Sequence, residues 1–557
     1  MEAYREQLHN ILIEGAARLG AVDALADLVA RLESLSKQIY QPCVVAVVGR
    51  VKAGKSTFIN ALLGEDLAKV GTTETTATIN YFSYGTPELE NPVICHWRGG
   101  GIECVDRAFL DELQGNDIET LRRADGIERL EYRLLNPYLE RVTLVDTPGT
   151  GAVVEEHQDR TAEFLTLYSQ LRERHDNETR VVQRDADAVV YLIGSSAATT
   201  TDRDFLEAFN QITGQDANPM NAVGVLSKID LNPTLMERRH ELSNKIGSQL
   251  QDTLNMIVPV SAGLHRALTV LKENDSAGLR KMAATFNQIP PALMKKMLSG
   301  ESLYLGDFPD CPISVEAREI LLGEMPWMVF ATIASELTKH HDPMEALSSL
   351  EEMSGFGELR TALELHFFHR SDFLRSYRVI TDARQALNLL RYSQLPAMEK
   401  ETREPRAQLE KFVKFTDSLR SSDTLARDLH AYLLQQLETI ADTAEMTRAL
   451  AELDTRLSMI YHELVEYNAD FTALQMMNGV PECFTEDELA ELRPLLGQYG
   501  LEQERRLPQD ITDPLSYVQD QQMKWRNMSW DCDESRRYVI ERATARYGLI
   551  MRDLADV

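Results

Sequence analysis

The segment Gly49–Ser56 constrains this chain more than any other. It reads Gly-Arg-Val-Lys-Ala-Gly-Lys-Ser and follows the apolar run Val44–Val48. Two glycines at this spacing let backbone N–H groups converge on phosphate oxygens, and a helix starting at Thr57 would direct its positive end at the same anion. The sequence therefore predicts a buried strand, a phosphate-binding loop and a helix in succession.

The loop supplies side chains as well as amides. Lys55 is placed to reach the outer phosphates of a nucleotide, and the Ser56 hydroxyl to bind Mg²⁺. The other positions predicted to line the phosphates are Gly49, Val51, Lys52, Ala53, Gly54 and Thr57.

A second motif follows the strand-like run Arg141–Val145. In Asp146-Thr147-Pro148-Gly149, Asp146 is predicted to hold Mg²⁺ through a water molecule, and the Gly149 N–H to contact the γ-phosphate. About ninety residues separate Ser56 from Asp146, enough for a switch segment.

The switch candidate is the threonine-rich stretch Gly71–Thr78. Thr76 is predicted to bind Mg²⁺ when GTP is present, with Thr75 as the alternative. Threonine clusters also precede ordinary strands, so a solvated loop is the competing interpretation.

Two further motifs read the base. After the run Ala222–Leu226, Ser227-Lys228-Ile229-Asp230 offers a carboxylate, Asp230, that can accept hydrogen bonds from N1–H and the exocyclic amine of guanine; adenine has no matching donors. After Met256–Val260, Ser261-Ala262-Gly263 presents the Ala262 N–H to guanine O6. The motif order favours GTP and GDP, and an ATPase is the weaker alternative.

Composition limits the partners. The chain has 557 residues, too many for one hydrophobic core, and its formal net charge of −29 argues against nucleic acid, which is bound mainly by Lys and Arg. The charge also weakens attraction to anionic lipid. No apolar run reaches the roughly 18 residues of a membrane span, and the first residues lack the pattern of a secretion signal. We expect a cytoplasmic protein, with peripheral attachment to the inner membrane as the alternative.

The six cysteines are scattered without a CxxC pair, which favours reduced thiols over a zinc site or a disulfide framework.

Apolar stripes at helical spacing flank the nucleotide motifs. The stripe Val22–Ile39 predicts a helix that packs within its own chain, with a coiled coil as the alternative. After Arg370 the pattern is almost entirely helical: a stripe over Leu425–Tyr467 predicts one long helix, and Pro514–Leu554 another.

These patterns predict the fold class and the domains. We expect an α/β P-loop GTPase domain, a mostly parallel sheet with helices on both faces, plus an elongated α-helical bundle built from N- and C-terminal segments. Residues 1–41 would join the bundle, residues 42–370 would form the GTPase domain, and residues 371–557 the bundle. The apolar segment near 471–500 is either a tip that contacts lipid or a partner, or, as we favour, a packed corner of the bundle.

The motifs together resemble the bacterial dynamin-like proteins, large GTPases of the dynamin superfamily. The resemblance rests on the phosphate loop, the long gap to Asp-Thr-Pro-Gly, the Ser-Lys-Ile-Asp motif and the Leu62–Leu67 segment. Ser354–Leu359, Ser-Gly-Phe-Gly-Glu-Leu, is similar to the closing helix of that family's GTPase domain. The family resemblance covers residues 42–370 well; the remainder of the chain resembles the family only in being helical.

The resemblance implies GTP hydrolysis, and the residues predicted to be catalytic in this chain are Lys52, Lys55, Thr76 and Gly149. It implies a homodimer or oligomer formed through the GTPase domain, or assembly with a second dynamin-like subunit, and movement of the helical bundle for membrane remodelling or vesicle-related work. The alternative is a GTP-gated scaffold that binds a partner protein and does not remodel lipid.

Two positions depart from the family pattern. Val51-Lys52 replaces Gln-Ser, the pair that positions water and a monovalent cation in the family; Lys52 either supplies the positive charge itself or is solvated. Ser227 replaces Asn or Thr, and its hydroxyl can still tie loops together, with a looser guanine preference.

Overall fold

Two compact units make up the chain. The computed structural model describes residues 2–20, 25–50, 53–64, 78–87, 92–113, 118–147, 186–194, 221–250, 253–254, 256–340, 342–368, 370–419, 424–439, 443–479, 483–499, 503–508, 511, 513–528 and 534–555. One unit comprises Pro42–Leu374, and the other comprises Met1–Gln41 with Arg375–Val557.

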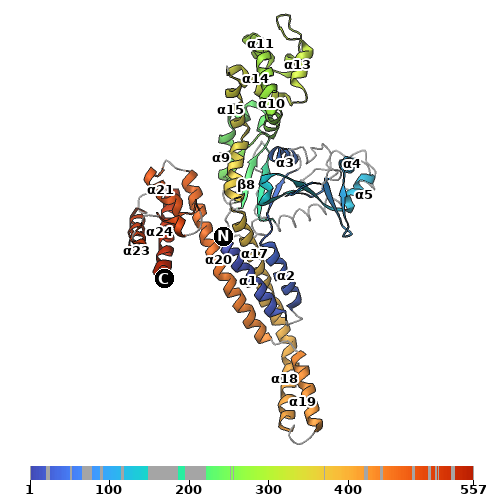
Figure 1. Ribbon diagram of the computed structural model, residues 1–557, viewed down its shortest axis with the longest axis vertical. Helices are drawn as coiled ribbons and strands as arrows, with labels where there is room; N and C mark the ends of the chain where they lie inside the picture. Colours follow the sequence, from blue (N-terminus) through green and yellow to red (C-terminus); the bar gives the residue numbers. More distant parts are fainter. Residues whose placement is uncertain are drawn as a thin grey trace. The chain divides into compact units, whose positions relative to one another are not determined.

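The first unit is built on a nine-stranded sheet in the order β4-β3-β5-β2-β6-β1-β7-β8-β9 (Figure 1). The strands from β6 to β9 in this order are parallel, whereas β2 pairs with β6, and β3 with β4 and β5, in antiparallel fashion. Strand bounds are β1 Cys43–Gly49, β2 Asn80–Tyr84, β3 Val93–Trp97, β4 Ile102–Val105, β5 Ile127–Leu134, β6 Val142–Asp146, β7 Ala188–Ile193, β8 Ala222–Leu226 and β9 Met256–Pro259.

The central strands are parallel because they are apolar on both faces. Every residue of β7 and of β8 is buried, as expected for strands covered by helices on each side. At the other end of the sheet, β5 pairs parallel with β2 and antiparallel with β3, and from Leu130 to Leu134 its buried residues alternate with more exposed ones, as expected for a strand with one solvated face.

Helices complete this unit. They are α3 Lys55–Leu63, α4 Arg107–Glu112, α5 Ile118–Gly126, α8 Pro233–Glu237, α9 Arg239–Gln249, α10 Ala262–Phe286, α11 Pro291–Met297, α12 Glu301–Tyr304, α13 Val315–Leu322, α14 Trp327–Lys339, α15 Pro343–Ser354 and α16 Phe356–Leu363. The apolar side of α14 lies in the core, where Phe330 contacts Phe286 and Tyr304. Short 3₁₀ segments are η2 Pro137–Glu140 and η4 Ile229–Leu231.

Among the described helices, no single one is long and apolar enough to cross a bilayer; the bent pair α13 and α14 meets the criteria of length and composition only when the two are taken together.

The second unit joins both ends of the chain. Its helices are α1 Glu2–Leu19, α2 Ala26–Gln38, α17 Ser371–Leu389 from Arg375 onward, α18 Leu395–Leu419, α19 Thr424–Thr439, α20 Thr443–Gly479, α21 Glu486–Leu495, α22 Gln503–Arg506, α23 Pro514–Met528 and α24 Glu534–Ala555. Helix α1 packs on α2 and α20, and the hydroxyls of Tyr4 and Tyr467 lie 2.8 Å apart. The predicted fold class, an α/β GTPase domain with a helical bundle made from both chain ends, is confirmed.

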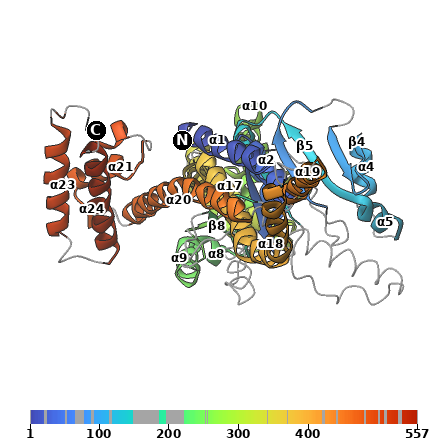
Figure 2. The same cartoon turned by 90° about the horizontal axis from the view of Figure 1, so that it is seen from below.

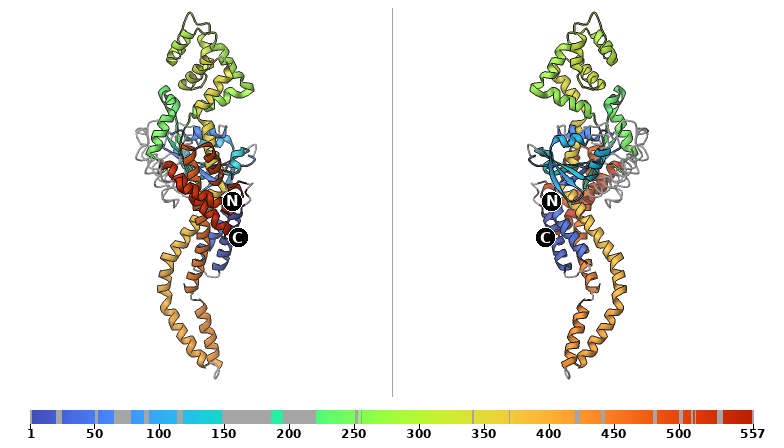
Figure 3. Two further views of the ribbon diagram at one scale, coloured as in Figure 1. Left: turned by 90° about the vertical axis from the view of Figure 1, so that its left-hand side faces the viewer. Right: turned by 90° about the vertical axis from the view of Figure 1, so that its right-hand side faces the viewer.

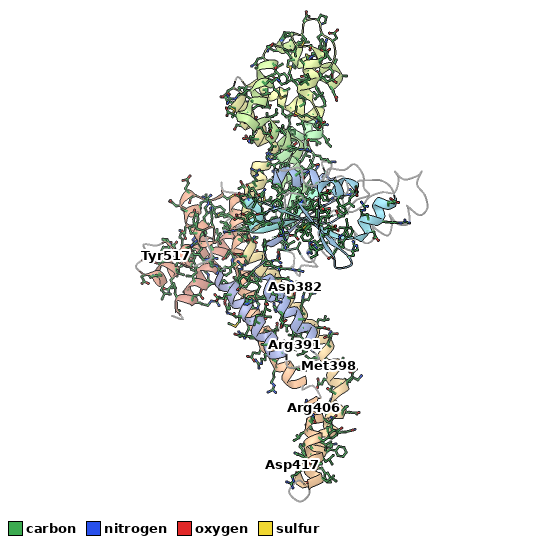
Figure 4. The ribbon with its side chains drawn as sticks, turned by 45° about the vertical axis from the view of Figure 1, so that its right-hand side comes forward. Asp382, Arg391, Met398, Arg406, Asp417 and Tyr517 are labelled. Atoms are coloured by element: carbon green, nitrogen blue, oxygen red, sulfur yellow. The ribbon has the colours of Figure 1, made fainter. Side chains whose placement is uncertain are left out.

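One helical path runs through this unit. Figure 4 follows it from Asp382 on α17, through Arg391 in the π-helical segment η6 Leu390–Gln394, to Met398, Arg406 and Asp417 on α18. The chain then returns along α19, so that α18 and α19 lie side by side as a hairpin (Figure 3).

The stripe predicted over Leu425–Tyr467 is apolar throughout but buried only in its second part. It is divided between α19 and α20, and residues 440–442 lie outside the described residues. On α20, Leu450, Leu457 and Leu464 are fully buried, because α1 and α24 pack against that helix. On α19, Leu425 and Leu429 are exposed. Periodicity alone does not distinguish these environments.

The C-terminal prediction of one helix over Pro514–Leu554 is wrong. Helices α23 and α24 pair side by side (Figure 2), and Gln522 Nε2 donates to the Thr544 carbonyl at 3.2 Å. In the 471–500 segment, Leu474, Met477, Phe484, Leu492 and Leu495 are buried in one core with Trp525 and Tyr547. Where the structure describes it, this segment packs most of its large apolar side chains into that core, while Met476 and Tyr499 are exposed.

Candidate GTP-binding site

Four motif-bearing loops leave the same edge of the sheet. The phosphate loop follows β1, Asp146 ends β6, Ser227–Asp230 follows β8, and Ser261–Gly263 follows β9. Because β6, β1, β7, β8 and β9 are parallel neighbours, their carboxyl ends meet at one edge, where ligands bind in open α/β sheets. Motifs distant in sequence therefore form one site.

The phosphate loop has the geometry of an anion cradle. Gly54 lies in the left-handed region, with φ at 91°, and α3 begins at the next residue. The Lys55 Nζ donates to the carbonyl oxygens of Gly49 and Arg50 at 3.2 and 3.4 Å. Burial lowers the pKa of Lys55, while Asp146 acts in the opposite direction. The amine is thus held inside the loop, where its described hydrogen bonds are to neutral carbonyl oxygens.

The residues predicted to bind Mg²⁺ are brought together. The Ser56 hydroxyl lies 3.3 Å from Asp146 Oδ2, and the Asp146 side chain is buried. Burial raises the pKa of Asp146 to about 6, against the opposing effects of Lys55 and the Ser56 hydrogen bond. Its Oδ1 is buried without a hydrogen-bond partner among the described residues. A hydroxyl and an unsatisfied carboxylate oxygen fit a hydrated Mg²⁺, which prefers oxygen ligands and keeps several waters.

The guanine motif is anchored to the phosphate loop. The Ser227 hydroxyl lies 2.8 Å from the Ala53 carbonyl oxygen and 3.1 Å from that of Ile193. Lys228 has φ at 61°, and its Cε lies 3.6 Å from where a Cβ on Gly54 would stand. Ser227 therefore makes the inter-loop tie that was expected of its hydroxyl.

Asp230 faces the start of α10. It is hydrogen-bonded to Ser261, and burial raises the pKa of Asp230. A Cβ on Gly263 would stand 2.9 Å from Asp230 Oδ2, so the carboxylate lies against this loop. Ser261 caps α10 by accepting from the Leu264 N–H at 3.0 Å, which leaves Ala262 at the first helical position, where the helix provides no acceptor for its N–H.

The structure describes only some of the remaining predicted site residues. Thr57 lies in the first turn of α3. Val51, Lys52, Thr75, Thr76 and Gly149 lie outside the described residues. The assignments of Lys52, Thr76 and Gly149 stay predictions.

Sequence reasoning missed two residues that hold the site. The Thr147 hydroxyl donates to the Val47 carbonyl at 3.0 Å, which fixes the end of β6 to β1. Phe356 packs against His265 at the start of α10. Thr147 gave no signal beyond its place in the Asp146 motif, whereas Phe356 lies in the Ser354–Leu359 segment quoted for the family resemblance.

Comparison with known proteins agrees with this geometry. The model of the dynamin family matches residues 45–229, from β1 to the guanine motif. This part of the chain is a dynamin-family GTPase domain. Isoniazid-induced protein IniC of Mycobacterium tuberculosis is 27% identical over 372 residues, 64% of this chain and 70% of IniC. IniA of the same organism is 29% identical over 245 residues, 43% of this chain and 34% of IniA.

A dynamin-like relative is found in Campylobacter jejuni as well. Dynamin-like protein 1 of that organism is 22% identical over 271 residues, 42% of this chain and 36% of that protein. A solved structure of an oligomerised bacterial dynamin pair aligns with 89% of this chain and 79% of that chain, at 15% identity and a TM-score of 0.28. The predicted dynamin-family GTPase is confirmed by the family match and by the described sheet and motif loops.

Replacing Asp146 tests the magnesium site. Its pKa is raised from 3.8 to about 6, so in this pH window the folded state binds more protons than the unfolded state, and stability falls as pH rises. Asp146→Asn removes the charge and should stabilise the nucleotide-free protein at pH 7 by about 1–3 kcal/mol. The same change should weaken Mg²⁺-dependent GTP binding. Thermal unfolding at pH 7 and pH 4 measures the stabilisation by Asp146→Asn, which should be smaller at pH 4. A variant that is destabilised equally at both pH values would contradict this prediction.

Replacing Asp230 tests the base contact. An Asn amide cannot accept both guanine donors, but it can donate to the 2-oxo group of xanthine. Asp230→Asn should lower GDP affinity by at least about a hundredfold, the cost of losing hydrogen bonds to a charged acceptor. Affinity for XDP should rise in the same protein, which shows that the fold is intact. Unchanged GDP affinity would remove Asp230 from the base site.

Proposed function

We propose that this dynamin-family GTPase binds Mg²⁺·GTP at the shared sheet edge, hydrolyses it in a self-associated state, and couples that cycle to a lipid bilayer through the α18–α19 hairpin. The convergence of four motif loops on one edge, with an unsatisfied Asp146 oxygen among them, carries the nucleotide part of the proposal. The exposed apolar surface of the hairpin carries the membrane part.

Each side chain has a role in this proposal. Lys55 exchanges its contacts with loop carbonyls for the β- and γ-phosphate oxygens, a stronger charge-assisted pairing. Ser56 and Asp146 would hold Mg²⁺, which when bound would neutralise charge that develops on the phosphates. Lys228 and Asp230 hold the guanine ring, with the Ala262 N–H on O6.

The residues that close the site on the γ-phosphate lie outside the described ranges. Thr76 is proposed to complete the Mg²⁺ ligands, and the Gly149 N–H to contact the γ-phosphate. Val51 has no polar atom with which to orient water. The positive charge that stabilises the transition state is proposed to come either from Lys52 or from a cation held in an interface with a second GTPase domain.

Self-association is proposed from the membership of the matched domain in the dynamin family. A second copy, joined through the GTPase domain, would exclude water from the nucleotide site; a second dynamin-like subunit is the alternative partner.

The α18–α19 hairpin exposes an unusual amount of apolar surface. Phe412 and Phe415 on α18 are 59% and 62% exposed, and Leu425 on α19 is 75% exposed. Leu429 and Tyr432 continue the exposed stripe along α19. The seam between the helices is partly polar: the Thr416 hydroxyl lies 3.0 Å from His430 Nδ1, and both side chains are buried. The larger apolar side chains are thus turned away from the seam.

The hairpin is also nearly neutral. Residues 395–439 carry seven Lys or Arg and eight Asp or Glu, in a chain with a net charge of −29. Lys411 and Lys414 flank Phe412. An apolar surface with basic flanks is the composition that partitions into a membrane interface, and repulsion from anionic lipid is weaker here than for the chain as a whole. This assigns the lipid contact to the hairpin and not to residues 471–500.

A protein partner is the second candidate for the same surface. The overall acidity of the chain opposes approach to anionic lipid, and exposed Phe and Leu in helices are also typical of docking faces. In that case the protein is a GTP-gated scaffold. For either candidate we propose a cytoplasmic protein, with peripheral attachment to the inner membrane in the first case.

Nucleotide-dependent size tests self-association. The wild-type chain should elute as a larger species with Mg²⁺ and a non-hydrolysable GTP analogue than with GDP, as measured by light scattering after gel filtration. Lys55→Ala should remain at the GDP-state size, because it loses phosphate binding. One size for the wild type under both conditions, despite GTP turnover, would contradict self-association.

Co-sedimentation with vesicles tests the hairpin. The pair Phe412→Ser and Phe415→Ser should lower binding to phosphatidylglycerol–phosphatidylethanolamine vesicles by at least about tenfold, since each buried aromatic contributes about 1.5–3 kcal/mol. The matched control is Tyr499→Ser with Met523→Ser, which removes two apolar side chains that are also exposed. GTP turnover without vesicles should stay at the wild-type rate in both. Wild-type protein that never sediments with vesicles would favour the scaffold.

A further inference from the structure

The turn between α15 and α16, whose Phe356 packs against His265, lies beside the loop assigned to the base. It comprises Ser354, Gly355 and Phe356, the start of the segment that resembles the family's closing helix. The turn belongs to the same compact unit as the sheet and docks on the end of β9, where the Ser261–Gly263 loop begins.

Backbone contacts hold the turn against that loop. The Ser261 N–H donates to the Ser354 carbonyl at 2.9 Å. Gly355 has φ at 74°, and a Cβ there would stand 2.0 Å from the Pro259 carbonyl oxygen. The approach is close enough that any side chain at Gly355 must separate the turn from β9.

An aromatic stack makes a second contact. The Phe356 ring is fully buried and parallel to the His265 ring, with centroids 4.1 Å apart and an interplanar angle of 7°. Its centroid lies 6.2 Å from that of Phe58 on α3, the helix that follows the phosphate loop. Burial, with Arg360 and Lys272 adding to it, lowers the pKa of His265 to about 4, so the ring in the stack is neutral at physiological pH.

Ser261 connects this packing to the base site. Its N–H is bound by Ser354, its hydroxyl accepts from the Leu264 N–H, and its side chain is hydrogen-bonded to Asp230. The position of the α15–α16 turn therefore sets the position of Ser261, and Ser261 orients the carboxylate.

We propose that the turn Ser354–Gly355–Phe356 positions the guanine-reading loop, and through Ser261 the Asp230 carboxylate, so that Gly355 and Phe356 are positioning residues for base discrimination. This rests on the proposed assignment of Asp230 to guanine. Among the described residues the turn bonds directly to Ser261 of the base-reading loop, and its link towards the phosphate side is the looser ring contact of Phe356 with Phe58 on α3, so its main effect is on recognition of the base.

A pair of glycine variants tests the proposal in the full-length protein. Gly355→Ala should lower GDP affinity by about ten- to a hundredfold, the scale of an ångström-sized misplacement. IDP lacks the exocyclic amine that donates a hydrogen bond to Asp230, so the affinity for IDP should fall less than the affinity for GDP. The ratio of GDP affinity to IDP affinity should therefore approach one. The matched control is Gly357→Ala, two residues further on, where a Cβ would meet no atom within 4 Å and affinity and ratio should stay at wild-type values.

A milder change guards against loss of fold. Phe356→Leu keeps an apolar side chain but removes the stack on His265, and should lower the GDP-to-IDP ratio by a smaller factor at an unchanged circular dichroism spectrum. A fall in GDP and IDP affinity by the same factor in both variants, or a wild-type ratio in folded Gly355→Ala, would overturn the positioning role. A wild-type protein that does not prefer GDP over IDP would instead overturn the assignment of Asp230.

Discussion

Parallel pairing of β6, β1, β7, β8 and β9 determines where every described nucleotide-binding residue lies. In a parallel array each strand ends at the same edge, so the loop after each strand is placed within reach of its neighbours. The pairing is stable here because β7 and β8 are buried throughout. Were a single strand reversed, Asp146 or Asp230 would leave the site.

Small hydroxyl side chains then fix the loops to one another. Ser227 reaches the phosphate loop, Thr147 reaches β1, and Ser261 reaches Asp230. Such bonds between buried groups are costly to leave unmade, so they select one arrangement of loops. Asp146 is the exception, since its buried carboxylate keeps an unpaired oxygen and a raised pKa. This local instability is what ligand binding can relieve.

The helical unit shows the same contrast between satisfied and unsatisfied groups. The buried Asp470 of α20 pairs with Arg506 at 2.8 Å, Arg542 at 2.6 Å and Arg546 at 2.5 Å, which binds α22 and α24 to α20. A buried ion cluster adds little net stability over an apolar core, but losing one member costs several kcal/mol, of order 3–5, so it specifies one packing. The α18–α19 hairpin has no comparable cluster among its described residues and leaves its aromatic side chains exposed.

The sequence by itself determined the features that depend on local rules. The glycines of the phosphate loop, the strand before each motif and the apolar spacing of the helices act within a few residues, so they predicted the fold class, the nucleotide family and the motif order. Tertiary structure alone decided which distant groups meet and which apolar residues are covered. Ser261 bonds to Ser354, Leu457 is buried while Leu425 is exposed, and α24 folds back on α23. Burial and distance are set by segments far apart in the chain, and no local pattern encodes them.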